Sequence, residues 1–296
     1  MQRRGLTDLS ARPSPVFIHP MPPILEIDRV SKIYRTEGGR EVRALESVSL
    51  AIRKGEFVSI IGPSGCGKST LFSIVGGLIT DYEGRVVIDG EVVNGTHKDI
   101  GMVFQEESTF PWRTTLENVA FPLEVAGVPR AEREERARAF VKLVGLEGFE
   151  HHYPAALSGG MKQRTAVARA LAYRPKIMLM DEPFGALDEQ TRLLLGDKLL
   201  EIWRELQQTM LLITHNITEA VQLSDRVVVI SYRPGRIKQI VAIDLPRPRT
   251  SEIISTPKFG EYVGRIWEDL RQEAARGMID AESASAATFR QRGTPS

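Results

Sequence analysis

Short apolar runs recur along the chain and predict buried strands. One run lies between Gly55 and Gly62, and two others end in Asp181-Glu182 and in Thr214-His215. A continuous apolar run of this length, without alternation, is typical of a strand covered on both faces in a parallel sheet. The runs predicted to be such strands are Phe57–Ile61, Ile177–Met180 and Met210–Ile213, and Val227–Ser231 is predicted to be a further strand.

The segments around these runs follow other periods. Ile24–Ile61 begins with alternating apolar and polar residues, which predicts β-structure. The mixed charges of Arg130–Arg136 stand at helix-pair spacing and predict a solvated helix face rather than a binding patch. The segments with helical spacing are Glu106–Ala172 for the most part, Thr191–Leu206 and Lys258–Arg276.

Composition sets limits on this pattern. The chain has 296 residues, 42% of them hydrophobic, and its formal net charge of +1 offers no electrostatic footprint for nucleic acid. No run approaches the ~18 apolar residues needed to cross a bilayer, and no signal peptide is visible. We therefore expect a soluble, cytosolic protein that reaches a membrane only through partners.

The expected domain limits follow from the same features. Residues 1–23 are rich in proline and polar side chains and are expected to be a disordered extension, with Met21 as an alternative start. Residues 24–245 are the expected folded domain, with a helical subdomain at about 106–172. Residues 246–296 are expected to be a tail, helical in part and then disordered from Ala281 onward.

A glycine-rich loop follows the first buried strand. It has the pattern Gly, four residues, Gly-Lys-Ser/Thr, between a strand and a helical run, which is the context of a phosphate-binding loop. Its glycines let successive N–H groups point inward as an anion nest, and the helix start adds unpaired donors. The loop residues are Gly62, Pro63, Ser64, Gly65, Cys66, Gly67, Lys68, Ser69 and Thr70.

The loop predicts a site for a nucleoside triphosphate. We expect Lys68 to bind the β- and γ-phosphates and the Ser69 hydroxyl to bind Mg²⁺. Cys66, the only cysteine, has two interpretations: a small residue that fits a crowded loop, which we favour, or a redox switch. Because nearby donor groups could favour its thiolate, we expect thiol reagents to inhibit the protein.

Polar residues at the ends of the other predicted strands supply the second half of a hydrolytic site. Open α/β sheets bind ligands at the carboxyl ends of their strands. We expect Asp181 to hold Mg²⁺ and Glu182 to polarise an attacking water, a role worth about 10²–10⁴-fold in rate. His215 is a candidate for a γ-phosphate contact. Gln105, which follows the apolar run Gly101–Phe104, is a candidate ligand of Mg²⁺ or sensor of γ-phosphate.

A second glycine motif, LSGGMKQR, spans Leu157–Arg164. The phosphate loop, Gln105, LSGGMKQR, IMLMDEP, the run Gly185–Asp188 and His215 occur in the order of ABC-transporter ATP-binding subunits, which the chain resembles from about Ile24 to Leu245. The motif LSGGMKQR is the specific part of the resemblance. Its fifth residue is commonly Gln and is Met161 here, which we do not expect to abolish activity.

The resemblance implies a fold and a shared active site. The expected fold is α/β: a P-loop NTPase core with a mostly parallel sheet flanked by helices, an N-terminal antiparallel β-subdomain and an inserted helical subdomain carrying LSGGMKQR, the signature. Two such subunits face head to tail, so that each ATP lies between one phosphate loop and the partner's signature. The resemblance further implies that Tyr34 stacks on adenine and that Asp188 lies at the dimer interface. The residues expected to contact the partner's ATP are Ser158, Gly159, Gly160 and Gln163.

Aromatic residues in the segment Ser108–Pro122, which begins as a predicted loop, predict an interface. In the family that the chain resembles, this region accepts a coupling helix from a membrane permease, so we expect Phe110 and Trp112 to form that groove. The alternative is that both rings only cover the helical subdomain. The sequence around the motifs resembles that of the importer branch for nitrate, taurine and aliphatic sulfonates. That branch implies a permease, a solute-binding protein and a position at the cytoplasmic face of the membrane.

Two other classes compete with a homodimeric or paired importer ATPase. A soluble ABC ATPase acting on DNA or ribosomes is disfavoured by near-neutral charge and by the short stretch Thr70–Leu157, which has no room for a long coiled coil. A single-site nucleotide enzyme, such as a kinase, leaves LSGGMKQR without a role.

Overall fold

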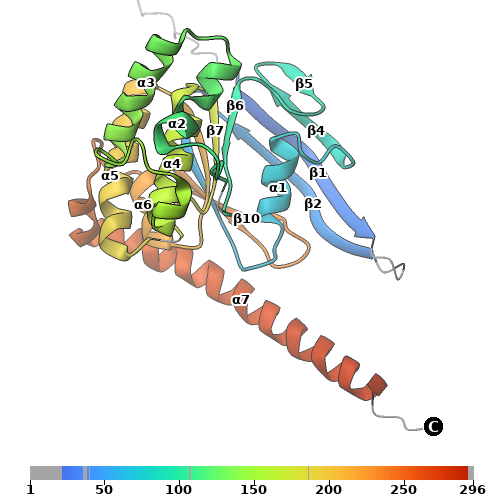
Figure 1. The fold of residues 1–296 in the computed structure, drawn as a ribbon. Coiled ribbons are helices and arrows are strands. Elements are labelled where there is room, and N and C mark those ends of the chain that lie inside the picture. Colours follow the sequence, from blue (N-terminus) through green and yellow to red (C-terminus); the bar gives the residue numbers. More distant parts are fainter. Residues whose placement is uncertain (1–21, 36–38, 40, 107, 186, 293–296) are drawn as a thin grey trace, which may run out of the picture.

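The computed structural model describes residues 22–35, 39, 41–106, 108–185 and 187–292, with side chains as far as Gly277. Our expectations for the segment before residue 22 and for residues 293–296 lie outside this range. Figure 1 shows two sheets side by side, a group of helices beyond the larger sheet, and a long C-terminal helix that leaves the body of the molecule.

The N-terminal sheet is antiparallel, in the strand order β2-β1-β4-β5. Along β1 the side chains of Leu25, Ile27 and Val30 are buried, and polar residues between them are more exposed, which explains the alternation in the sequence. This confirms the predicted N-terminal β-subdomain. Its strands are β1 (Leu25–Arg35), β2 (Glu41–Ile52), β4 (Glu83–Ile88) and β5 (Glu91–Val93).

The central sheet contains the apolar runs predicted to be buried strands. Its order is β10-β9-β3-β8-β7-β6, with β10 antiparallel to β9 and the other five strands parallel. Every residue of β3 and β8 is buried, because helices and the N-terminal sheet cover both faces. The strands are β3 (Phe57–Ile61), β6 (Ile100–Val103), β7 (Ile177–Asp181), β8 (Thr209–Ile213), β9 (Arg226–Ile230) and β10 (Ile237–Ala242).

Parallel pairing brings the carboxyl ends of β3, β6, β7 and β8 to one edge of the central sheet. The phosphate loop, Gln105, Asp181-Glu182 and His215 follow these four strands in turn. The topology therefore collects at one edge residues that are up to about 150 positions apart in the chain.

The helices are of two kinds, those that cover the central sheet and those that form a separate subdomain. Their bounds are α1 (Lys68–Val75), α2 (Thr115–Val125), α3 (Arg130–Leu143), α4 (Gly159–Ala172), α5 (Glu189–Leu206), α6 (Ile217–Leu223) and α7 (Pro257–Arg292), with short 3-10 turns η1 (Pro154–Ala156) and η2 (Ser251–Ser255).

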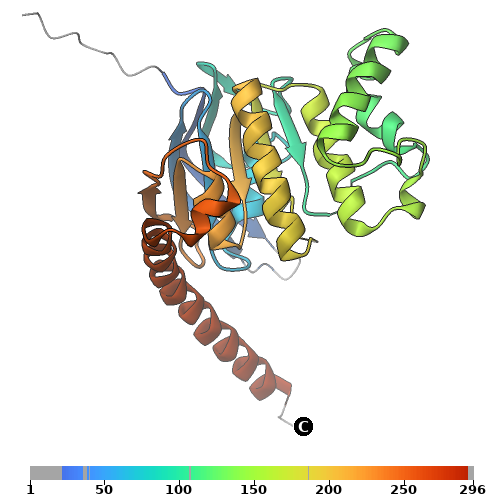
Figure 2. The same ribbon diagram turned by 90° about the vertical axis from the view of Figure 1, so that its left-hand side faces the viewer.

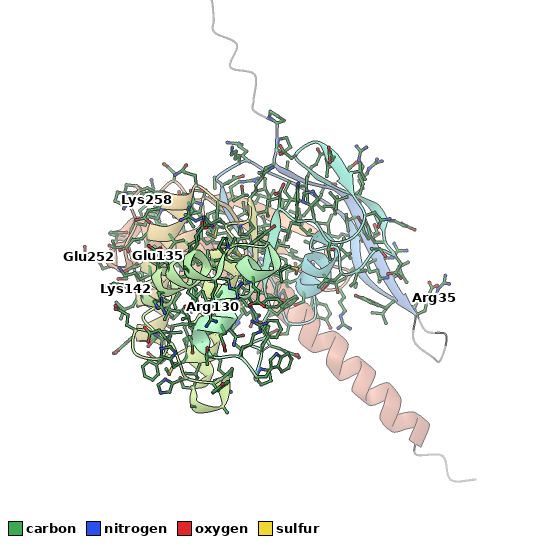
Figure 3. All side chains as sticks on the ribbon, turned by 45° about the horizontal axis from the view of Figure 1, so that its top comes forward. Arg35, Arg130, Glu135, Lys142, Glu252 and Lys258 are labelled. Carbon is green, nitrogen blue, oxygen red and sulfur yellow. The ribbon has the colours of Figure 1, made fainter. Side chains whose placement is uncertain are left out.

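The helical subdomain consists of α2, α3 and α4, which pack around a shared apolar cluster that includes Val119, Phe140 and Leu171. Figure 2 shows it projecting from one end of the molecule. On α3 the charged residues form ion pairs along the outer face, such as Arg130 with Glu134 at 2.8 Å, and Arg130, Glu135 and Lys142, labelled in Figure 3, are exposed. This confirms the predicted solvated face.

The C-terminal helix differs from the sequence expectation. It begins at Pro257, where proline suits a first helical turn, and continues to Arg292, where we expected disorder from Ala281 onward. The segment beyond Gly277 contains four alanines and neither glycine nor proline before Gly293, so its local propensity permits a helix. Within the described residues, no helix is long and apolar enough to cross a membrane.

Candidate nucleotide-binding site

The glycine-rich loop joins β3 to α1 by way of a glycine in a left-handed conformation. Gly67 stands at the N-cap of α1 with φ +103°, a region that favours glycine. A Cβ atom there would lie 2.7 Å from the carbonyl oxygen of Ala44 on β2, so the close approach of the loop to this strand also requires glycine. The first N–H groups of α1 have no acceptor within the helix, which makes this end an anion site.

Lys68 is held inside the loop by the loop's own carbonyl groups. Its Nζ donates to the carbonyl oxygen of Gly62 at 2.8 Å and to that of Pro63 at 2.9 Å, and the residue is 8% exposed. An ammonium group has three donors, and among the described residues the third has only the weak acceptor Cys66 Sγ, at 3.9 Å. A phosphate oxygen is a far stronger acceptor, so the ammonium is oriented to serve one.

Cys66 differs from the expectation of a reactive thiol. Its side chain is fully buried, and this burial raises the pKa of the thiol despite the opposing effect of the Lys68 charge. Because the thiolate is the nucleophile, such a thiol reacts slowly, and the expected inhibition by thiol reagents loses its physical basis. A Cβ atom on Gly62 would lie 2.8 Å from Cys66 Sγ, which supports the other interpretation, a small residue in a crowded loop.

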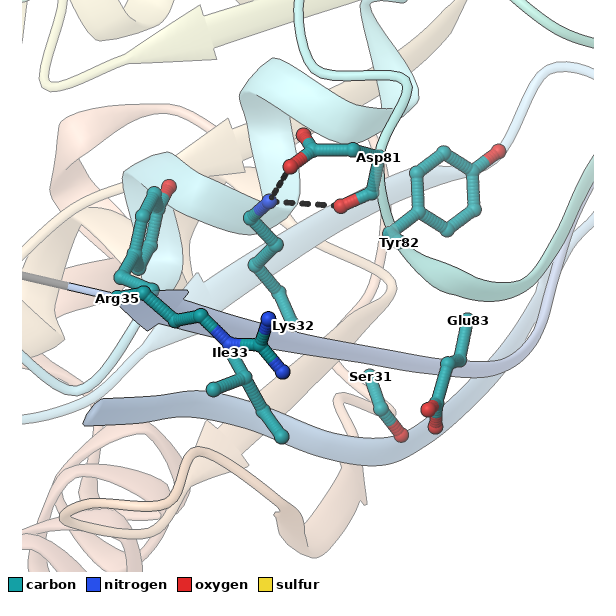
Figure 4. A pocket seen from close by; sticks show the side chains of 8 residues that line it. Ser31, Lys32, Ile33, Arg35, Asp81, Tyr82 and Glu83 are labelled. Atoms are coloured by element: carbon teal, nitrogen blue, oxygen red, sulfur yellow. Dashed lines mark hydrogen bonds and ion pairs between the residues drawn. The ribbon is translucent and has the colours of Figure 1, made fainter. Parts of the chain in front are cut away.

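Tyr34, near the end of β1, is held from two sides. Lys32 Nζ lies over its ring, 5.0 Å from the centroid, and its hydroxyl lies 3.4 Å from Thr70 Oγ1. Lys32 is fixed in turn by Asp81, whose carbonyl oxygen is 2.6 Å and whose Oδ2 is 2.5 Å from Nζ (Figure 4). One face of the ring is therefore covered, while 40% of the residue stays exposed. The open face suits stacking by a purine base.

Two hollows share Tyr34 as a wall. The one in Figure 4, about 590 Å³, runs along β1 beside Lys32 and Asp81. The other, about 230 Å³, is lined by the phosphate loop at Gly65, Lys68 and Thr70. Only the smaller hollow contains the loop's donors, so it is the candidate phosphate site, and Tyr34 forms part of its wall.

Asp181 and Ser69 place side-chain oxygen atoms at the same edge. Burial raises the pKa of Asp181, and a hydrogen bond with the Ser69 side chain partly offsets this rise. Asp181 Oδ1 is buried and has no hydrogen-bond partner among the described residues. An unpartnered buried carboxylate oxygen is costly unless a cation or donor approaches it, and Mg²⁺ prefers such hard oxygen ligands. The residues present therefore fit Mg²⁺.

Glu182 is the point where three strand ends meet. Its Oε2 accepts a hydrogen bond from Gln105 Nε2 at 3.2 Å and lies 3.1 Å from His215 Nδ1. Its backbone has φ +47°, unusual for a residue with a side chain, and its N–H donates to the carbonyl oxygen of Ile213 at 2.9 Å. Strain of this kind, about 1–3 kcal/mol, concentrates at functional sites. The structure thus brings together Gln105, Glu182 and His215, as the sequence predicted.

The second glycine motif forms another helix start. Ser158 is the N-cap of α4 and accepts a hydrogen bond from Met161 N at 3.3 Å, and both Ser158 and Gly159 are exposed. None of Ser158, Gly159 and Gly160 lines the hollow at the phosphate loop. The chain therefore has two helix starts with N–H groups that could bind an anion, one at α1 and one at α4, and the second is open to the surface.

Comparisons with known proteins agree with this geometry. The ABC transporter family profile matches residues 45–185. An uncharacterized ABC transporter ATP-binding protein of Methanocaldococcus jannaschii is 50% identical over 254 residues, which cover 86% of this chain and 94% of the relative. The chain belongs to this family.

Other relatives of this ABC ATPase have assigned transport roles. The aliphatic sulfonates import ATP-binding protein of Bacillus cereus is 45% identical over 86% of this chain and 96% of its own length. The nitrate import ATP-binding protein of Synechocystis is 45% identical over 83% and 95%. A solved dimeric cassette, MJ0796 bound to ADP and Pi, matches with a TM-score of 0.67 and 37% identity, covering 75% of this chain and all of that one. The predicted α/β ATPase fold is confirmed.

Gln163 differs from the other signature residues of this ABC ATPase. It is 5% exposed, and its Nε2 donates to the carbonyl oxygen of Phe104 at 3.3 Å, next to Gln105. This burial is inconsistent with the expected contact to a partner's ATP in the described conformation. The residue instead links the signature helix α4 to the segment that carries Gln105. The position of Gln163 within LSGGMKQR does not by itself indicate which way its side chain faces.

Asp188 is exposed and caps α5, accepting hydrogen bonds from the Thr191 backbone N–H at 2.9 Å and the Thr191 hydroxyl at 2.7 Å. The backbone bond is the main reason that the pKa of Asp188 is lowered. A carboxylate fixed in this way at the surface is available to a partner, and its interface role stays a prediction.

The aromatic residues after Gln105 form one cluster on the helical subdomain. Phe110 packs against Phe121 in a T-shaped pair with centroids 4.7 Å apart, and against Trp112 at 5.6 Å. Buried Asn118 ties the segment down by accepting from Phe110 N at 2.8 Å and donating to three backbone carbonyls. Phe110 is half-buried, whereas Trp112 is 70% exposed. Within this cluster, Trp112 is therefore the ring presented to solvent.

Sequence reasoning missed one residue at the phosphate loop. Arg233, from the turn between β9 and β10, lines the 230 Å³ hollow, and its Nε donates to the carbonyl oxygen of Gly65 at 2.7 Å. It belongs to no nucleotide motif. The signal that could have drawn attention to it is the basic turn Tyr232–Arg236 directly after a buried parallel strand of the same sheet.

Proposed function

We propose that the chain is the ATP-hydrolysing subunit of an ABC importer, which works as a dimer around two molecules of MgATP and moves a membrane permease. The observation that carries the hydrolytic part is the carboxylate of Glu182, held between Gln105 and His215 next to the phosphate loop. A carboxylate fixed by two neighbours can accept the proton of an attacking water, and His215 beside it would contact the γ-phosphate.

In the proposal, Ser69, Asp181 and the amide oxygen of Gln105 hold Mg²⁺. The ion would neutralise phosphate charge as the bond to the leaving group breaks. Lys68 and the loop N–H groups bind the phosphates, the open face of Tyr34 stacks on adenine, and Glu182 orients and deprotonates the water. Asp181 and Glu182 then have separate roles, one as a ligand and one as a base, although they are adjacent in sequence.

Two copies of the chain, or this chain and a close relative, would face head to tail. Ser158, Gly159 and Gly160 start α4 at the surface and would bind the γ-phosphate of the partner's ATP, while Asp188 would lie at the interface. The similarity to MJ0796, a cassette solved as a dimer, supports a dimeric state.

The importer assignment rests on the named relatives and on the exposed ring of Trp112. We propose nitrate, sulfonate, taurine or a similar small solute as the cargo, a permease bound at Phe110 and Trp112, and a separate solute-binding protein. The ATPase would be peripheral, at the cytoplasmic face of the membrane, and would not bind nucleic acid.

The test compares Glu182→Gln with the double variant Glu182→Gln, Lys68→Ala. With MgATP, the single variant should bind ATP, lose about 10²–10⁴-fold in turnover and accumulate as a dimer in sedimentation. The double variant should stay monomeric, because it lacks the charge that binds the phosphates. Rapid hydrolysis by Glu182→Gln would reject Glu182 as the base.

A pull-down of the trapped dimer from gently solubilised membranes then tests the transport part. Co-purification of a multi-span permease with the single variant, and not with the double one, supports the importer. Recovery of only ribosomal or DNA-bound partners would overturn the importer and leave the ATPase assignment intact.

A further inference from the structure

The turn between β9 and β10, residues 231–236, packs directly on the phosphate loop. Gly235 N donates to the carbonyl oxygen of Ala44 at 2.9 Å, and a Cβ atom on Gly235 would lie only 2.2 Å from the carbonyl oxygen of Cys66. No side chain fits between the turn and the loop at this point, so a shift of the turn would displace the loop.

Arg233 extends from this turn into the nucleotide hollow. Its Nε is occupied by the Gly65 carbonyl at 2.7 Å, and within the described part of the chain its terminal nitrogens donate to no protein acceptor. The guanidinium lines the same hollow as Lys68 and Thr70 and is charged at every physiological pH. A fork of free, charged donors beside a polyphosphate site suits a phosphate oxygen.

The other side of the turn is held by α7. Glu273 on this helix is 1% exposed, and its Oε2 accepts a hydrogen bond from Tyr232 N at 3.0 Å, one residue before Arg233. Its Oε1 lies 3.1 Å from Lys238 Nζ and from Arg276 Nη1. The Glu273 carboxylate is held firmly in place, because losing these three contacts would leave a buried charge without a partner.

Gly277, one turn further along α7, lies against the Tyr232 ring. A Cβ atom there would stand 2.9 Å from Tyr232 Cε2. Glycine lowers helix stability relative to alanine, and here it lets the helix backbone approach the ring closely. The helix therefore holds Tyr232 by its backbone N–H and by its ring.

We propose that Arg233 binds a phosphate of the nucleotide and that α7 positions it through Glu273 and Tyr232, so that the C-terminal helix sets nucleotide affinity. The inference rests on the nucleotide role of the loop given under the proposed function. Arg233 is the contacting residue, and Glu273 acts only through it.

The experiment measures the Kd of ADP and of ATP for the full chain by titration calorimetry. Arg233→Ala should weaken both nucleotides about tenfold or more, as expected for the loss of a charge-assisted hydrogen bond. Arg233→Lys should recover part of this loss, since it keeps the charge but not the fork that also engages Gly65. Glu273→Gln should weaken binding as well, and adding it to Arg233→Ala should cause no further loss.

Glu268→Gln is the matched control, because it is the same change at an exposed glutamate on α7 that pairs with Arg271 at 3.0 Å. It should leave both Kd values unchanged. Each variant is also melted, and binding is measured where all are folded. Unchanged Kd in Arg233→Ala overturns the contact. Additive losses in the double variant, or a lower melting temperature without a change in Kd for Glu273→Gln, overturn the positioning role. Lys68→Ala serves as the reference: if it also leaves Kd unchanged, the nucleotide site itself is wrong, whereas a loss confined to Lys68→Ala rejects only Arg233.

Discussion

Glu219 is a buried carboxyl group near the hydrolytic centre that the proposed chemistry does not use. It is 7% exposed on α6, and its Oε1 has no hydrogen-bond partner among the described residues. The pKa of Glu219 is raised to about 7, mainly by burial. A hydrogen bond with Thr214 lowers the pKa, whereas the nearby charge of Glu182 raises it further. At neutral pH and below, Glu219 in the folded protein therefore holds a proton. In the unfolded chain the same carboxyl group loses this proton near its ordinary pKa of 4.5.

This proton makes stability depend on pH with a definite sign. Because the folded-state pKa lies above the unfolded one, the contribution of Glu219 is fully present below pH 4.5 and is lost as the pH rises to about 7. Glu219→Gln mimics the protonated group at every pH. Its free energy of unfolding, relative to the natural protein, should rise by up to about 3 kcal/mol between pH 4.5 and 8.

Urea unfolding of both proteins at several pH values measures this difference, and other titrating groups cancel in the comparison. Glu135→Gln, at an exposed site on α3, gives the background effect of the same substitution. A difference between Glu219→Gln and the natural protein that does not change with pH would contradict the buried proton.

Single residues also show where sequence reasoning succeeds. Asp181, Glu182 and His215 were predictable because each directly follows an apolar strand, and parallel strands end at one edge. Arg233 was not, because its partner Gly65 lies 168 positions away and no local pattern records their contact. Gln163 lies inside a recognised motif, yet its burial depends on how α4 packs against the segment after β6.

At the scale of elements, period and length explain most of the outcome. The buried strands were predictable because continuous apolar runs have few alternatives once glycine or proline bounds them. The full length of α7 was not, since the composition after Gly277 is small and polar and permits either helix or disorder. Packing of Phe259 and Ile266 against α6 and β9 anchors the first half of α7, which local composition cannot show.

The loop after β6 and the helix α2 together hold the exposed ring of Trp112. Phe110 supports the Trp112 ring, and Arg169 lies over Phe110 at 4.8 Å, so the exposed ring has a rigid base. Trp112→Ala should weaken binding to the permease by about 30-fold or more, as for an interface hot spot. ATP affinity of the isolated protein should stay the same.

Trp267→Ala is the control for Trp112, since Trp267 is 57% exposed on α7, far from the cluster in sequence and on a different element. Binding of each variant to permease-containing nanodiscs is compared with its ATP affinity. Equal permease binding by Trp112→Ala and the natural protein would contradict the groove assignment. Equal losses of permease affinity in Trp112→Ala and Trp267→Ala would show that the effect is not specific to the Trp112 site.

At the scale of the whole molecule, the chain presents two candidate phosphate sites, one at each of two helix starts. The site at α1 contains Lys68 and opens into the hollow beside Tyr34, while the site at α4 begins at exposed Ser158 and does not line that hollow. One γ-phosphate needs only one such set of donors. A second copy, turned by a two-fold rotation, would use both sets and make each ATP site from two chains.

Mixing two inactive variants tests this arrangement. Lys68→Ala disables the loop of its own chain. Gly159→Asp places a carboxylate at the start of α4, where a Cβ atom meets nothing within 4 Å, so the fold should tolerate it while the partner's phosphates are repelled. Each variant alone should hydrolyse ATP slowly. In a mixed dimer, one site combines two damaged halves and the other combines two intact halves, so an equal mixture should regain up to about a quarter of the natural turnover. Activity that stays at the sum of the separate variants, although mixed dimers form in sedimentation, would mean that each ATP site is complete within a single chain.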